Sequence, residues 1–118
     1  MSYRQFETPN LSDLSEVDRI SLLEGGGDLG VLALRAVSDD GDHVDLTLDP
    51  LGRSIRLVWI ADGRRLVDVY REGATRFDVS QEPGSAVLRV AVEYDDAAGL
   101  LEVGIGSEVS VKDRLMFN

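Results

Sequence analysis

The sequence has no cysteine, only one histidine and only three prolines. Without cysteine the chain can form neither a disulfide framework nor a thiolate nucleophile, which is typical of a reducing compartment. A single histidine cannot supply the imidazole cluster of a metal site. No apolar run approaches the roughly 20 residues of a membrane span, and residues 1–10 lack the apolar core of a signal peptide. We therefore expect a cytoplasmic protein that does not contact a membrane.

Hydrophobic residues make up 43% of the 118 positions, which is enough to fill one core. No repeat, low-complexity tract or linker divides the chain, so we expect a single domain over residues 1–118. Within it, residues 1–9 are expected to form a loose N-terminal arm.

Negative charge dominates, with a formal net charge of -10, but it is unevenly distributed. Residues 51–76 hold six arginines against three acids and form the one basic stretch. Acids outnumber bases by eleven to three in residues 1–50 and by eight to three in residues 77–118. Such a charge disfavours nucleic acid, because phosphate neutralisation drives that affinity. It suits either plain solvation or steering toward a basic protein partner.

Alternation of apolar and polar residues predicts strands along most of the chain. His43–Asp49 is the clearest case, because Val44, Leu46 and Leu48 point one way and the residues between them point to water. Asn10 is a good helix N-cap before Leu11, so one short N-terminal helix is expected. The fold class is therefore all-β, a mostly antiparallel meander of about eight or nine strands, closed into a barrel or folded into a sandwich.

The central prediction concerns residues 55–71, in which two apolar runs flank the hairpin signal Asp62-Gly63. A two-residue turn there predicts four facing pairs: Trp59 with Leu66, Val58 with Val67, Leu57 with Asp68, and Ile55 with Tyr70. Both faces of this hairpin are apolar, so both are expected to be covered, either by the fold or by a partner.

A second hairpin is expected from residues 86–94 and 99–106, joined by a four-residue loop at 95–98. That loop pairs Val92 with Leu101, Val90 with Val103, and Leu88 with Ile105, and these six side chains form one apolar face. Arg89 and Glu102 become diagonal neighbours on the reverse face. Residues 75–79 are predicted to form a further strand, at an edge of the sheet. Residues 109–117 are predicted to form either a last strand or a strand followed by a tail.

Two motifs suggest ligands but lack the context that ligands need. Gly25, Gly27 and Gly30 match the spelling of a dinucleotide fingerprint, yet the helix that must follow is too short and a hairpin replaces the second crossover. The aspartates of residues 39–42 lack the ligand spacing of a calcium loop. A glycine-rich loop and a solvated turn are the favoured interpretations, and no cofactor or metal is expected.

The usual catalytic sets are absent as well, and we lean toward a protein that is not an enzyme. Two positioned carboxylates can still perform acid–base chemistry, and Asp68 is the best catalytic candidate. The predicted register places it on an apolar face, where burial would raise its pKa unless an arginine pairs with it. The alternatives are a structural ion pair with Arg35, Arg53 or Arg89, or a position at an exposed sheet edge.

Three functions remain. The favoured one is a non-catalytic protein-binding module, acting as an inhibitor, immunity-type protein or accessory subunit through residues 55–71. Aromatic and arginine side chains dominate interface hot spots, so the expected contacts are Trp59 and Tyr70, with Arg56, Arg64 and Arg65 around them. The second is a small-ligand barrel of the cyclase or isomerase kind, with Asp68, Tyr70 and Trp59 lining its cavity. The third is a homodimer or another self-associating structural subunit.

Overall fold

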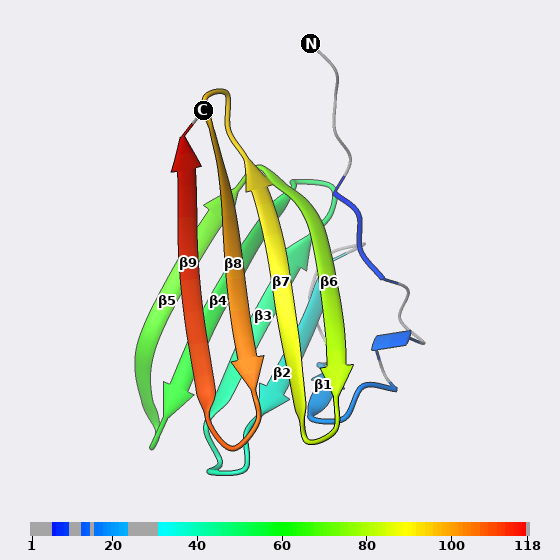
Figure 1. The fold of residues 1–118 in the computed structure, drawn as a ribbon, viewed down its shortest axis with the longest axis vertical. Helices are drawn as coiled ribbons and strands as arrows, with labels where there is room; N and C mark the ends of the chain where they lie inside the picture. Colours follow the sequence, from blue (N-terminus) through cyan, green and yellow to red (C-terminus); the bar gives the residue numbers. More distant parts are fainter. Residues whose placement is uncertain (1–5, 10–12, 15, 24–30, 118) are drawn as a thin grey trace.

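The computed structural model describes residues 6–9, 13–14, 16–23 and 31–117. It contains nine strands: β1 (Ile20–Leu22), β2 (Leu32–Val37), β3 (His43–Asp49), β4 (Ser54–Ala61), β5 (Arg64–Glu72), β6 (Ala74–Glu82), β7 (Ser85–Glu93), β8 (Ala97–Ile105) and β9 (Val109–Phe117). The first five form one antiparallel sheet and the last four form another, each in sequence order (Figure 1). The prediction of an all-β meander is confirmed, and the two separate sheets form a sandwich rather than a closed barrel.

The core lies between the two sheets, because every second side chain of each strand points inward. Val44, Leu46 and Leu48 are buried as the pattern of β3 predicted. Opposite them, β7 buries Leu88 and Val90. Apolar side chains from both sheets form one continuous cluster, so the space between the layers is filled by side chains.

The chain passes from the first sheet to the second at Gly73, between β5 and β6. Gly73 has φ +80°, a left-handed conformation that glycine adopts at little cost. Its carbonyl accepts a hydrogen bond of 2.9 Å from the Glu93 N–H, and the next residue, Ala74, donates one of 2.9 Å to the Arg53 carbonyl. These bonds attach the crossing segment to both sheets.

Two residues of the N-terminal arm, Phe6 and Glu7, are held against the fold, so the expectation of a loose arm is wrong for these two residues. The Glu7 N–H donates to the Thr75 carbonyl at 2.9 Å, and the Phe77 N–H donates to the Glu7 carbonyl at 2.8 Å. Phe6 is buried in the core. Glu7 therefore partly pairs the outer edge of β6, which would otherwise be open.

Only part of the expected N-terminal helix can be compared. Asn10 and Leu11 lie outside the described residues, as do the glycines of the dinucleotide-like motif. Asp13 and Leu14 are helical, and Leu14 is buried against the core.

The central hairpin turns at Asp62-Gly63 as predicted, but its register differs beyond the turn. A β-bulge at Leu66 interrupts the pairing, so Trp59 pairs with Val67, Val58 with Asp68, Leu57 with Val69, Arg56 with Tyr70, and Ile55 with Arg71. All four predicted pairs, Trp59 with Leu66, Val58 with Val67, Leu57 with Asp68 and Ile55 with Tyr70, are therefore wrong. An extra residue exchanges the two faces of a strand. Here the exchange turns Val67 toward the core and Asp68 toward solvent, which avoids burying a carboxylate.

The second hairpin has its predicted faces in a register shifted by two residues. Its loop is Asp95-Asp96 rather than four residues, and the Tyr94 N–H closes the turn on the Ala97 carbonyl at 2.8 Å. Val92 therefore pairs with Gly99, Val90 with Leu101, and Leu88 with Val103. A shift of two residues preserves the side-chain alternation, so the six predicted apolar residues all remain buried. Arg89 and Glu102 are direct partners rather than diagonal neighbours.

Candidate protein-binding surface

One face of the central hairpin is left uncovered by the second sheet. We call this face the hairpin surface and define it as Arg56, Val58, Ile60, Arg64, Arg65, Leu66, Asp68 and Tyr70. Val58 and Ile60 are only partly buried and lie outside the core cluster. The bulge residue Leu66 is 53% exposed and Tyr70 is 56% exposed. Both apolar faces of the hairpin were expected to be covered, by the fold or by a partner. The fold covers the inner face and leaves the outer face exposed.

Ion pairs with Asp68 orient two arginines of the hairpin surface, Arg56 and Arg65. Arg56 donates two hydrogen bonds to Asp68, at 3.0 Å and 2.7 Å, and Arg65 donates a third at 3.3 Å. The Arg56 hydrogen bonds, with the charges of both guanidinium groups, hold the pKa of Asp68 below its ordinary value. A side chain that is already ordered by an ion pair loses less entropy on binding than a free one. The pairs with Asp68 therefore prepare these arginines for contact with a partner.

The bulge brings Tyr70 to the face of the hairpin that carries Arg56. Tyr70 and Arg56 are cross-strand neighbours on the hairpin surface, and Asp68 joins Arg56 to Arg65. Arg64 is exposed at the turn. Trp59 points the other way and packs against the core cluster.

Asp68 forms a structural ion pair, as one of the alternatives anticipated, but with Arg56 and Arg65 instead of Arg35, Arg53 or Arg89. Arg35 pairs with Asp45 on β3 at 2.7 Å. A carboxylate with a lowered pKa is a poor proton acceptor at neutral pH. The geometry of Asp68 therefore suits orientation of the arginines better than acid–base work.

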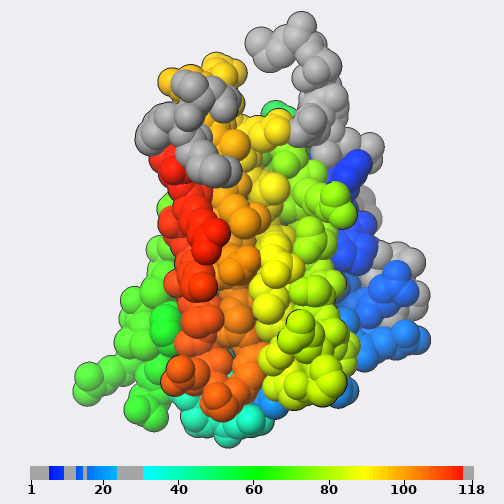
Figure 2. All heavy atoms as spheres, in the orientation of Figure 1, coloured from blue at the N-terminus to red at the C-terminus, as the bar shows by residue number. Residues whose placement is uncertain are grey.

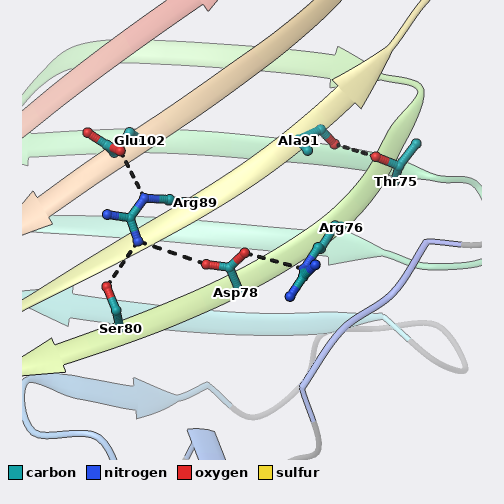
Figure 3. A network of polar contacts seen from close by, with 7 residues as sticks. All are labelled: Thr75, Arg76, Asp78, Ser80, Arg89, Ala91 and Glu102. Carbon is teal, nitrogen blue, oxygen red and sulfur yellow. Dashed lines mark hydrogen bonds and ion pairs between the residues drawn. The ribbon is translucent and has the colours of Figure 1, made fainter.

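The outer face of the second sheet has a different character (Figure 3). Arg89 in β7 donates to Glu102 at 2.9 Å and to Ser80 at 3.0 Å, and Asp78 lies 4.0 Å away. Around this network the face carries small residues such as Gly104 and Ala91. Its described residues include no exposed aromatic ring like that of Tyr70, although Val87 and Leu100 are partly buried here as Val58 and Ile60 are on the hairpin surface. It serves as an internal comparison.

A cavity of about 670 Å³ opens where the edge strands β5 and β9 meet. Figure 2 shows the two strands together along one side of the molecule, β5 in green and β9 in orange to red. An ion pair between Arg71 and Asp113 joins them across the two sheets. Tyr70 lines this cavity, whereas Trp59 and Asp68 do not. The three residues expected to share a ligand cavity are therefore separated.

The turn after β2 gathers carboxylates, and Asp42 is the one whose ionisation is disfavoured. Partial burial raises its pKa, and the charges of Asp40 and Asp62 add to the effect, against smaller opposing contributions from His43 and Trp59. The indole N–H of Trp59 faces this carboxylate without a regular hydrogen bond, since Nε1 has no hydrogen-bond partner among the described residues. Asp40 is already held by the Ser38 hydroxyl and by the Asp42 N–H, the latter at 3.1 Å.

Asp42→Asn is expected to raise the melting temperature at pH 7. Because the folded pKa of Asp42 is raised, its ionised form destabilises the fold above that pKa. The penalty fades as the pH falls through the folded pKa and is gone below the unfolded value, about 3.9. Thermal unfolding at pH 7 and near pH 3.5 should show the advantage of the variant shrinking in acid.

Asp95→Asn is the matched control, since it removes the same charge from an exposed turn at another hairpin. If Asp42→Asn melts below the parent protein at pH 7, the carboxylate stabilises the turn and the expectation is wrong. An equal gain from both variants would assign the effect to net charge instead of to this cluster.

Comparisons with known proteins describe the fold. No family model matches the chain, and no curated protein matches it either. No helix among the described residues has the length and apolar content that crossing a bilayer requires. A solved structure is similar over 97% of this chain and 100% of its own, with a TM-score of 0.70 at 12% identity. It is a chain of the contact-dependent growth inhibition toxin–immunity protein complex from Klebsiella pneumoniae 342.

Proposed function

We propose that this protein is a non-catalytic binding module of the immunity or inhibitor type, and that it contacts its partner through the hairpin surface. One observation carries the proposal: an exposed apolar strip lies beside arginines already oriented by Asp68. Exposed apolar patches with a polar rim are characteristic of protein interfaces. Tyrosine and arginine are the residue types that most often dominate binding energy.

The similar solved structure supports the same class of function. Its fold is similar across nearly the whole chain, and its name places it in a complex of a toxin and an immunity protein. At 12% identity the likeness concerns the fold, so it supports a protein partner without naming one.

Charge suggests how the partner approaches. A net charge of -10 favours encounter with a basic protein, since complementary fields raise association rates. The hairpin surface then forms the close contact, in which its paired arginines offer donors and its apolar strip excludes water. We place this interaction in the cytoplasm.

The decisive experiment identifies a stoichiometric partner from the native host and measures its affinity for variants. The Arg64→Glu/Arg65→Glu double variant and Tyr70→Ala should each weaken binding at least about 30-fold, the size of a hot-spot loss near 2 kcal/mol. Calorimetry with the purified partner gives these affinities. The partner's own activity should fall when it is saturated with this protein.

Arg76→Glu is the matched control, because Arg76 is exposed on the second sheet and pairs with one nearby aspartate, as Arg65 does. It should leave binding almost unchanged. Equal losses from Arg76→Glu and from the hairpin variants would exclude a local contact. A clean homodimer in light scattering, dissociated by Tyr70→Ala, would favour the self-associating subunit instead.

A further inference from the structure

The cavity between β5 and β9 has features that the hairpin surface does not share. It lies at the end of the sandwich where β5, β7, β8 and β9 come together, and its volume is about 670 Å³. That volume falls within the range of pockets that take a small molecule or a partner's side chain. Its chemistry can therefore be examined separately from that of the hairpin surface.

Val92, Gly99 and Leu115 form the apolar floor of the cavity, and the floor stays open because Gly99 has no side chain. Gly99 occupies an inward position of β8, directly between Val92 of β7 and Leu115 of β9. A methyl group added at Gly99 would lie 2.8 Å from Cγ2 of Val92. Any larger residue here would fill the floor, so the glycine preserves the hollow.

Two tyrosines form the walls. Tyr70 is 56% exposed and Tyr94 is 42% exposed, and both line the cavity. The Tyr70 hydroxyl lies 3.4 Å from Oε1 of Glu72, which places a carboxylate beside one aromatic wall. Aromatic faces combined with a nearby carboxylate are suited to a cation, which the ring quadrupole and the charge both attract.

The charges of the lining residues balance one another. Arg71 and Asp113 form an ion pair across the sheets, and Arg114 offsets Glu72. Two further carboxylates, the exposed Asp95 and Asp96, directly follow the wall residue Tyr94 in the chain. They add negative charge next to a neutral cavity, which favours a cation over an anion.

We propose that this cavity binds a basic side chain, lysine or arginine, from the protein partner. The proposal rests on the proposed function for the existence of that partner, but it assigns a second contact with its own chemistry. The alkyl part of the side chain packs on Gly99 and Leu115, and its charged end lies between the tyrosines and Glu72. The hairpin surface and this cavity share Tyr70, so one partner can occupy both.

The test uses the isolated protein and needs no partner. Amide chemical shifts are followed by NMR during titration with N-acetyl-arginine amide, its neutral citrulline analogue and N-acetyl-glutamate amide. The arginine compound should give saturable shifts at Tyr94, Gly99 and Leu115, with a millimolar dissociation constant expected for so small a ligand. The citrulline and glutamate compounds should bind at least about threefold more weakly.

Variants locate the effect. Glu72→Gln and Tyr94→Ala change exposed side chains and should each weaken arginine binding about threefold. Glu82→Gln removes the same charge from the distant β6–β7 turn and should not change it. Preference for the glutamate compound, or no saturable shift at these residues, would overturn the proposal. Neither result would affect the Arg64→Glu/Arg65→Glu variant, whose residues lie outside the cavity lining, so this failure is distinguishable from failure of the proposed function.

Discussion

Phe77→Ala is expected to lower the free energy of unfolding by about 3–5 kcal/mol, the usual cost of deleting a buried phenylalanine ring. Phe77 is 2% exposed and is among the largest fully buried side chains. It reaches from β6 into the cluster shared by both sheets. Natural domains are stable by only about 5–15 kcal/mol, so this one change removes a large share. Urea unfolding followed by circular dichroism measures it.

Two further variants make the comparison specific. Tyr94→Ala removes an aromatic ring of similar size that is 42% exposed, and should change stability by about 0.5 kcal/mol or less. Phe77→Leu keeps most of the volume and should cost less than half as much as alanine. A loss below about 1 kcal/mol for Phe77→Ala would mean that the sheets do not pack on this ring.

The strands could be predicted from sequence because their signal is local. An antiparallel sheet with one covered face requires alternation, and residues 43–49 display it without interruption. Residues 86–93 keep an apolar residue at every inward position, although Val87 and Ala91 are apolar on the outer face as well. For the same reason the predicted faces of the second hairpin were correct although its predicted register was wrong by two residues. A period of two is insensitive to such a shift.

The register of the central hairpin could not be predicted from its turn. A bulge at Leu66 depends on which face of β5 the second sheet covers, and that information lies outside the hairpin. One signal was nevertheless present. Straight pairing would have placed Asp68 on the covered face without a nearby arginine, and this cost argues for an exchange of faces. The same exchange brought Arg56 to Asp68.

The candidate sites depended still more on tertiary structure. Tyr70 and three arginines were proposed by residue type, and all four are exposed on the hairpin surface. Their role in binding stays a prediction. Trp59 was assigned by type as well, although alternation along β4 places it on the inward face with Ile55 and Leu57. The cavity combines segments near Tyr70, Val92 and Leu115, which are distant in sequence, so no local pattern could have indicated it.

Gly73→Ala is the second large effect that we expect, a loss of about 2–4 kcal/mol in the free energy of unfolding. Part of it is backbone strain, because Gly73 has φ +80° and a side chain there costs about 1–2 kcal/mol. The remainder is a steric conflict: the added methyl group would lie 2.6 Å from the Glu93 carbonyl oxygen. Thermal and urea unfolding measure the sum.

Gly84→Ala separates the two contributions, because Gly84 has the same φ of +80° and nothing within 4 Å of an added methyl group. It should show the strain alone, so the difference between the variants reports the contact with Glu93. Equal losses would mean that the two chain segments move apart freely. In the expected case the conflict also displaces the end of β5 from β7, and since Tyr70 and Glu72 lie there, Gly73→Ala should weaken arginine binding in the cavity while Gly84→Ala should not.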